Sequence, residues 1–259
     1  MNRPGICKLC KQQGELQNSH LLPSACYALI HSRKTANPNP VFVTDRRAYT
    51  TSRQIQDYLL CSDCEDRFNK RGEAWVLENC YRGPGRFLLR ENLTRYRAVA
   101  QHVGILVFEG ARIPEIDCAK LIFFGMSVFW RAGAHDWPRG NERAGIALGS
   151  YLDPIGHFLL DETNFPDKML LVVRVSSLQD GLLGHMNLPE SQTNDGFRTH
   201  HFAIPGVIFM LSVGGKIPPD QMATAPNPEC YISICPQFDR ETLEHTSMRV
   251  NSAKRRGHL

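Results

Sequence analysis

The sequence predicts an α+β fold in two parts, a cysteine-bearing segment at residues 1–82 and a larger α+β domain at residues 83–259. Its hydrophobic content of 42% and charged content of 22% are typical of globular proteins, which excludes a disordered or collagen-like chain. No apolar run approaches the roughly 18 residues of a membrane span. No apolar signal-peptide core precedes the first cysteines. We therefore expect a cytoplasmic protein with no membrane partner.

Two C-x-x-C pairs, Cys7–Cys10 and Cys61–Cys64, predict a metal site in the first part. This spacing lets two thiolates from one turn reach the same Zn²⁺ ion, with Zn–S distances near ~2.3 Å. Two such pairs complete a closed tetrahedral site, so the zinc is expected to be structural. The 50 residues between the pairs exceed the gap of a simple zinc ribbon, so we expect an insertion between the two halves.

The other cysteines suggest no disulfide framework, because the total of nine is odd and no secretion signal is recognised. Cys26, Cys80 and Cys118 lie in apolar or amphipathic surroundings and are expected to be buried small hydrophobes. Cys230 and Cys235 flank a short strand, and a second metal site there would lack two ligands.

Positive charge is concentrated at the N-terminal end of the chain. Residues 1–100 carry a net charge of +7 and the remainder carries −3, which indicates a polyanionic partner or an arginine-rich solvated surface. The insertion at residues 27–56 is basic, with a short helix expected at 27–31 and strands at 41–43 and 48–50. It is interpreted as a nucleic-acid arm, and a solubilising loop is the alternative.

Two segments beside the cysteine pairs occur in a characteristic order. Ser19-His20-Leu21-Leu22-Pro23 follows the first pair, and Leu59-Leu60 leads into the second pair, which Glu65 follows at once. Together they resemble the HNH (His-Me finger, ββα-metal) endonuclease family, in the type that carries a four-cysteine zinc. The resemblance covers residues 1 to about 80 and implies a zinc-braced ββα-metal finger, which is treble-clef-like.

The resemblance also implies a reaction, the hydrolysis of phosphodiester bonds in DNA or RNA. His20 is the expected general base, and Asp57 stands where the family's middle asparagine fixes the histidine tautomer. A catalytic Mg²⁺ or Mn²⁺ is expected on Ser19 and Glu65, although Ser19 departs from the family's usual aspartate. A role in bacterial defence would fit the family.

A helix expected over residues 62–77 places further polar side chains beside this site. Glu65, Asn69 and Glu73 are spaced by four residues and share one helix face. Asn69 is therefore a further candidate ligand of the catalytic ion, and a solvated face of paired charges is the alternative. The predicted phosphate-binding residues are Arg46, Arg47, Arg53, Arg67, Lys70 and Arg71.

Gly83-Pro84-Gly85 marks the boundary between the two parts. Arg131 lies at the end of an expected apolar helix. Its side chain is interpreted either as a ligand for an anion or as a cap on the helix carbonyls. We expect this domain of unknown role to recognise a target or a protein partner. The expected helices are 88–103, 119–131, 149–161 and 240–250, and the expected strands are 169–175, 201–204, 207–213 and 230–234.

The leading hypothesis is a metal-dependent HNH-like endonuclease, with double-stranded DNA as the first-choice partner. One alternative is a catalytically inactive, zinc-containing nucleic-acid-binding module, and another is a protein-interaction adaptor. A nuclease needs Mg²⁺ or Mn²⁺ besides the zinc. A binding module shows only a salt-dependent affinity, and an adaptor shows neither property.

Overall fold

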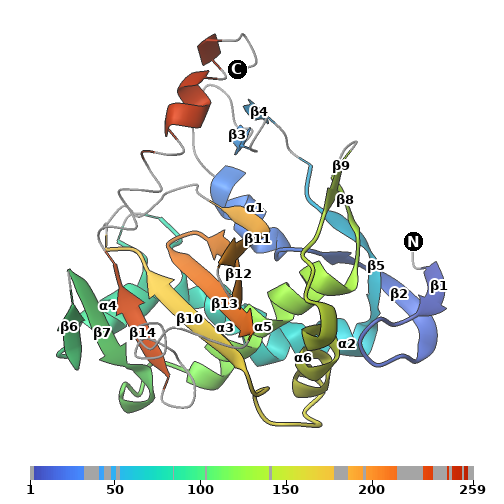
Figure 1. Cartoon of the computed structure of the whole chain (residues 1–259), viewed down its shortest axis with the longest axis horizontal. Helices are drawn as coiled ribbons and strands as arrows, with labels where there is room; N and C mark the ends of the chain where they lie inside the picture. The colour runs from blue at the N-terminus through green and yellow to red at the C-terminus, as the bar shows by residue number, and fades with distance from the viewer. Residues whose placement is uncertain are drawn as a thin grey trace.

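The fold was analysed in a computed structural model. It describes all residues except 1–2, 32–40, 44–47, 51–52, 84, 103, 140–141, 178–185, 195–196, 215–229, 236–243, 245–246, 253 and 256–259. Arg46 and Arg47 therefore lie outside the described residues. No helix in the described part of the chain combines the length and apolar character needed to span a membrane. The described elements form a mixed α+β structure (Figure 1).

The N-terminal part is built on a three-stranded antiparallel sheet in the order β1-β2-β5. β1 spans Arg3–Ile6, β2 spans Gln13–His20 and β5 spans Gln56–Cys61. Helix α1 (Ser24–His31) follows β2, and helix α2 (Ser62–Phe68) begins directly after β5. The sheet therefore brings the end of β2 close to the start of α2, although the insertion separates them in sequence.

The predicted elements of the insertion are confirmed where the structure describes them. The helix expected at 27–31 is the second half of α1. The two expected strands are β3 (Val41–Val43) and β4 (Ala48–Thr50), which pair with each other in an antiparallel ladder.

The helix expected over residues 62–77 is present, but its middle is a π-helical turn. This turn, η1 (Asn69–Glu73), joins α2 to α3 (Ala74–Asn79). Gly72 lies in the turn, where a Cβ atom would come within 2.9 Å of the backbone nitrogen of Phe124. The glycine therefore lets η1 and the central helix α5 (Cys118–Ala134) approach backbone to backbone.

The C-terminal part is built on a seven-stranded sheet in the order β11-β12-β13-β10-β14-β7-β6 (Figure 1). Neighbouring strands are antiparallel, except that β10 and β14 run parallel. Helix α5 packs on this sheet, since the ring of Phe124 meets that of Phe209 at 5.3 Å between centroids. The strands are β6 (Ala100–His102), β7 (Ile105–Glu109), β10 (Met169–Val175), β11 (Asn187–Asn194), β12 (Phe197–Ile204), β13 (Val207–Gly214) and β14 (Tyr231–Ile234).

The remaining elements are short helices and one hairpin. They are α4 (Leu88–Thr94), η2 (Gly110–Arg112), η3 (Gly149–Tyr151), α6 (Leu152–Leu159) and the paired strands β8 (Trp137–Arg139) and β9 (Glu142–Ala144). The helices expected over 119–131 and 149–161 and the four expected strands are confirmed. The helix predicted over 88–103 is confirmed only as far as the end of α4, and the prediction is wrong beyond it. There the amide of Val99 donates to the carbonyl of Val107, and the chain joins the sheet as β6. Residues 247–252 are helical, near the helix expected at 240–250.

One continuous hydrophobic cluster runs through both parts of the chain. Phe68 of α2 meets Phe123 and Trp130 of α5 edge to face, with ring centroids 5.9 and 6.1 Å apart. The core therefore continues across the boundary that the sequence predicts near residue 83. This packing fixes α5 beside the three-stranded sheet.

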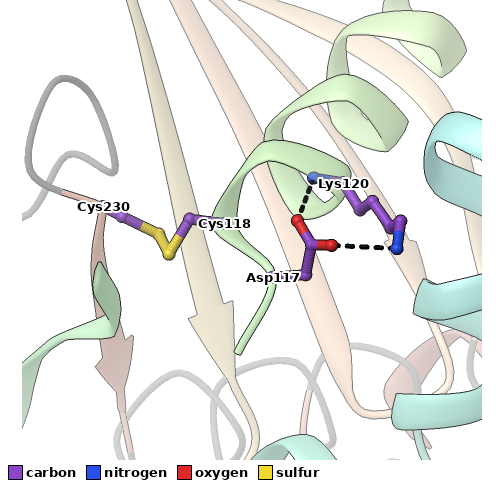
Figure 2. Close-up of a disulfide and its surroundings, with 4 residues drawn as sticks. All are labelled: Asp117, Cys118, Lys120 and Cys230. Atoms are coloured by element: carbon purple, nitrogen blue, oxygen red, sulfur yellow. Dashed lines mark hydrogen bonds and ion pairs between the residues drawn. A yellow bond between two sulfur atoms is a disulfide. The ribbon is translucent and has the colours of Figure 1, made fainter. Parts of the chain in front are cut away.

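A disulfide joins Cys118 at the start of α5 to Cys230 beside β14 (Figure 2). The expectation that Cys118 is a buried small hydrophobe is therefore wrong, since it forms the one disulfide among the described residues. Beside the disulfide, the amide of Gly110 donates to the carbonyl of Cys230 at 2.8 Å. Asp117 accepts from the Lys120 amide there and also pairs with its ammonium group (Figure 2). Cys26 and Cys80 are buried and free, as expected.

Candidate functional site

The four predicted zinc cysteines come together at one end of the three-stranded sheet. Cys7 and Cys10 lie in the turn between β1 and β2, Cys61 ends β5, and Cys64 lies in the first turn of α2. Their four sulfur atoms lie within 4.8 Å of one another. Among the described residues, this is the one group of three or more cysteine, histidine or carboxylate side chains close enough to hold a metal ion.

Backbone hydrogen bonds hold the first cysteine turn in place. The amide of Cys7 donates to the carbonyl of Gln12 at 2.9 Å, and the amide of Lys8 donates to the carbonyl of Leu59 at 3.1 Å. Lys11 closes the turn in the left-handed region, at a φ of 61°. The turn is thus anchored to β5, which carries the third cysteine.

The thiols of the cysteine cluster interact electrostatically with one another. The thiol of Cys64 hydrogen-bonds to Cys7 and lowers the pKa of Cys7 to about 4, and the same interaction raises the pKa of Cys64. Sulfur donors at this separation are the ligands that zinc prefers in closed structural sites. The cluster fits a structural zinc ion.

A cavity of about 580 Å³ opens beside this cluster and receives side chains from both parts of the chain. His20 comes from the end of β2, Glu65 from α2 and Asn69 from η1. Glu73 and Arg131 also line the cavity. Three of the residues predicted for catalysis or for the catalytic ion, His20, Glu65 and Asn69, therefore face one space.

Ser19 does not line this cavity. Its side chain is 2% exposed, and its Oγ accepts the amide of Leu60 at 3.3 Å. Successive residues of a strand point to opposite faces, so Ser19 points away from the face of His20. The hydroxyl therefore bonds to the neighbouring strand β5, and the structure does not bring it to the other predicted ligands.

Asp57 also lies on the face opposite His20, because it pairs directly with Ser19 across the β2–β5 ladder. Its carboxylate accepts the amide of Tyr58 at 2.8 Å and contacts His135 Nε2 at 2.9 Å. Partial burial raises the pKa of Asp57, but these hydrogen bonds outweigh it and lower the pKa below its usual value. The histidine that Asp57 orients is thus His135, which sequence reasoning missed because no local motif marks it.

Arg131 lines the cavity and is only 2% exposed. Its guanidinium forms a close ion pair with Glu73 and lies 3.9 Å from Glu65 Oε2. The ring of Phe68 lies 4.7 Å from the guanidinium carbon. The arginine reaches across to the helix opposite, so it does not serve as the helix cap considered from the sequence.

The cavity offers oxygen donors for a divalent cation but not a closed ligand set. Glu65 Oε1 is buried and accepts no hydrogen bond from the described residues. An orphaned carboxylate oxygen beside the amide of Asn69 fits Mg²⁺ or Mn²⁺, which prefer oxygen ligands.

Three of the basic residues predicted to bind phosphate, Arg67, Lys70 and Arg71, have carboxylate partners of their own within the structure. Arg67 and Arg71 both donate to Asp161 Oδ2, and Lys70 pairs with Asp66. The Arg71 guanidinium holds the pKa of Asp161 below its usual range. Arg53 is exposed ahead of β5. A polyanion would compete with these surface carboxylates, which are partly exposed.

Comparison with protein families, with curated proteins and with solved structures finds no match for this chain.

Proposed function

We propose that this chain is a zinc-containing endonuclease of the HNH type that hydrolyses phosphodiester bonds in nucleic acid, with double-stranded DNA as the first-choice substrate. The observation that carries the proposal is that His20 and Glu65, far apart in sequence, line one cavity beside four clustered cysteines. The order of cysteine turn, two paired strands and helix supports a zinc-braced ββα (treble-clef-like) finger.

The chemistry of the cavity follows from its side chains. His20 would act as the general base that accepts a proton from the attacking water, a role that histidine side chains commonly perform. Glu65 and Asn69 would hold a Mg²⁺ or Mn²⁺ ion, which supplies Lewis-acid stabilisation of the scissile phosphate when it is bound. Arg131 lines the same cavity, and its guanidinium stacks on the ring of Phe68.

The test is the nicking of supercoiled plasmid by zinc-loaded protein with Mg²⁺ or Mn²⁺. We expect His20→Ala to lose about 100-fold or more of the rate, the usual contribution of a general base. His157→Ala is the matched control, because His157 is exposed and pairs with Glu162 outside the cavity. Equal nicking by His20→Ala and the parent protein would contradict the proposal.

A second candidate is a catalytically inactive nucleic-acid-binding module. The observation in its favour is that Arg131 already neutralises Glu73 and approaches Glu65, so the cavity carboxylates have a cation from the protein itself. Such a module would show salt-dependent binding without cleavage in any divalent ion. A protein-interaction adaptor would bind no nucleic acid at all.

A further inference from the structure

We propose that Arg131 is a positioning residue that holds the carboxylate of Glu65 in the cavity. The inference rests on the proposed function and gives the C-terminal part of the chain a role in it. Arg131 belongs to α5, whereas Glu65 belongs to α2. A side chain from one part of the protein would thus set the geometry of a site carried by the other.

The burial of Arg131 is energetically unfavourable if packing is its sole role. Its Nε and Nη1 atoms are buried and find no hydrogen-bond acceptor among the described residues. Unsatisfied buried donors are costly, and a hydrophobic side chain of similar volume often stabilises such a position equally well or better. Stacking on Phe68 offsets part of this cost. The arrangement favours a role for the guanidinium at the carboxylates it faces.

The surrounding backbone is built to bring the guanidinium to these carboxylates. The π-helical turn follows Glu65 by one helical turn and ends at Glu73, and π turns inside helices are frequent at functional sites. Gly72 in that turn allows the backbone of α5 to approach closely. Arg131 follows Phe124 by two helical turns, so this contact leads its side chain toward both glutamates.

The two carboxylate oxygens of Glu65 have different surroundings. Oε2 faces Arg131 at 3.9 Å, while Oε1 has no hydrogen-bond partner within the described part of the chain. The arginine therefore restrains one oxygen and leaves the other for a ligand. Glu73 takes the closer ion pair, so it anchors the guanidinium rather than the ion.

The experiment compares two variants that differ only at Arg131, namely Glu73→Gln and the double variant Arg131→Met with Glu73→Gln. The Gln background avoids a buried, unpaired carboxylate at position 73. Mn²⁺ binding is measured on zinc-loaded protein by the paramagnetic resonance of free Mn²⁺, beside plasmid nicking. We expect Glu73→Gln to bind Mn²⁺ within about threefold of the parent, and the double variant to bind at least tenfold more weakly at an unchanged melting temperature.

Equal Mn²⁺ affinity of the two variants would overturn the positioning role, and so would loss of Mn²⁺ binding in Glu73→Gln alone. A parent protein that binds Mn²⁺ but never nicks plasmid would overturn the proposed function, and the two variants would still decide the role of Arg131. No Mn²⁺ binding by the parent overturns both. If the double variant fails to fold, Arg131→Lys in the same background replaces it, with a three- to tenfold loss expected.

Discussion

The four-cysteine cluster and the neighbouring cavity differ in how their donor groups are assembled. The four cysteine sulfurs lie close together. Two come from the turn between β1 and β2, and two come from the junction of β5 and α2. In the cavity, the two glutamates face Arg131, which arrives from α5 in the other part of the chain. The cysteine cluster is formed by the N-terminal part of the chain alone, whereas the cavity depends on packing between the two parts. The two sites should therefore respond differently to substitution.

The largest effect is expected at the cysteine cluster. Cys64→Ser removes one sulfur ligand, so bound zinc should fall well below one ion per chain and the melting temperature should drop steeply, since zinc binding is coupled to folding. Atomic emission and thermal unfolding measure both quantities. Cys80→Ala is the control, because Cys80 is a free, buried cysteine that does not belong to the four-cysteine cluster. Full zinc content in Cys64→Ser would contradict the structural assignment.

A smaller effect, confined to the cavity, is expected from Gly72→Ala. The added Cβ would lie 2.9 Å from the backbone nitrogen of Phe124, so η1 and α5 must separate. Overpacking of this kind costs about 1–3 kcal/mol in the free energy of unfolding. Zinc content should be unchanged, whereas Mn²⁺ binding and nicking should weaken.

Chemical denaturation of Gly72→Ala measures this cost, and Gly14→Ala is the matched control. A Cβ at Gly14 meets no atom within 4 Å, so its substitution should change stability by less than about 0.5 kcal/mol. An unchanged stability of Gly72→Ala would show that the contact between η1 and α5 relaxes without cost.

The smallest effect is expected from Asp161→Asn. The pKa of Asp161 is lowered by Arg71, so its ion pairs contribute stability above the usual aspartate pKa and lose it as the pH falls through the lowered value. Because the Asp161 side chain is 48% exposed, the loss at neutral pH should be at most about 1 kcal/mol.

Unfolding of Asp161→Asn measured from pH 2 to pH 7 checks both the size and the sign. The variant should show a flatter loss of stability in acid than the parent. It should also bind DNA more tightly at low salt, because Arg67 and Arg71 are released. An unchanged affinity for DNA would contradict the prediction that Arg67 and Arg71 bind phosphate groups.

The sequence predicted the features that depend on local spacing. The two C-x-x-C pairs and the helix that begins after Cys61 are each encoded within a few neighbouring residues. The pairing of β2 with β5 then follows and places His20 and Glu65 in one cavity.

The remaining features of the site depend on contacts between distant segments. Arg131 reaches Glu73 of η1, and His135 reaches Asp57 of β5, through the packing of α5 on the N-terminal part of the chain. No motif in the sequence of α5 reports that packing. Ser19 and Asp57 point away from His20 because strand alternation and cross-strand register decide the face. The π turn depends on the close approach of η1 to α5 at Gly72, which a helical repeat alone does not reveal.

The disulfide between Cys118 and Cys230 also acts on the unfolded chain. It closes a covalent ring across a sequence separation of 112 residues, and among the described elements this ring contains α5, the β8–β9 hairpin and strands β10 to β13. Closing a ring of this size removes many conformations from the unfolded ensemble and favours the native state by roughly 2–5 kcal/mol. Reduction of the Cys118–Cys230 disulfide would therefore lower the free energy of unfolding of the fold that holds Arg131 beside Glu65 and Glu73.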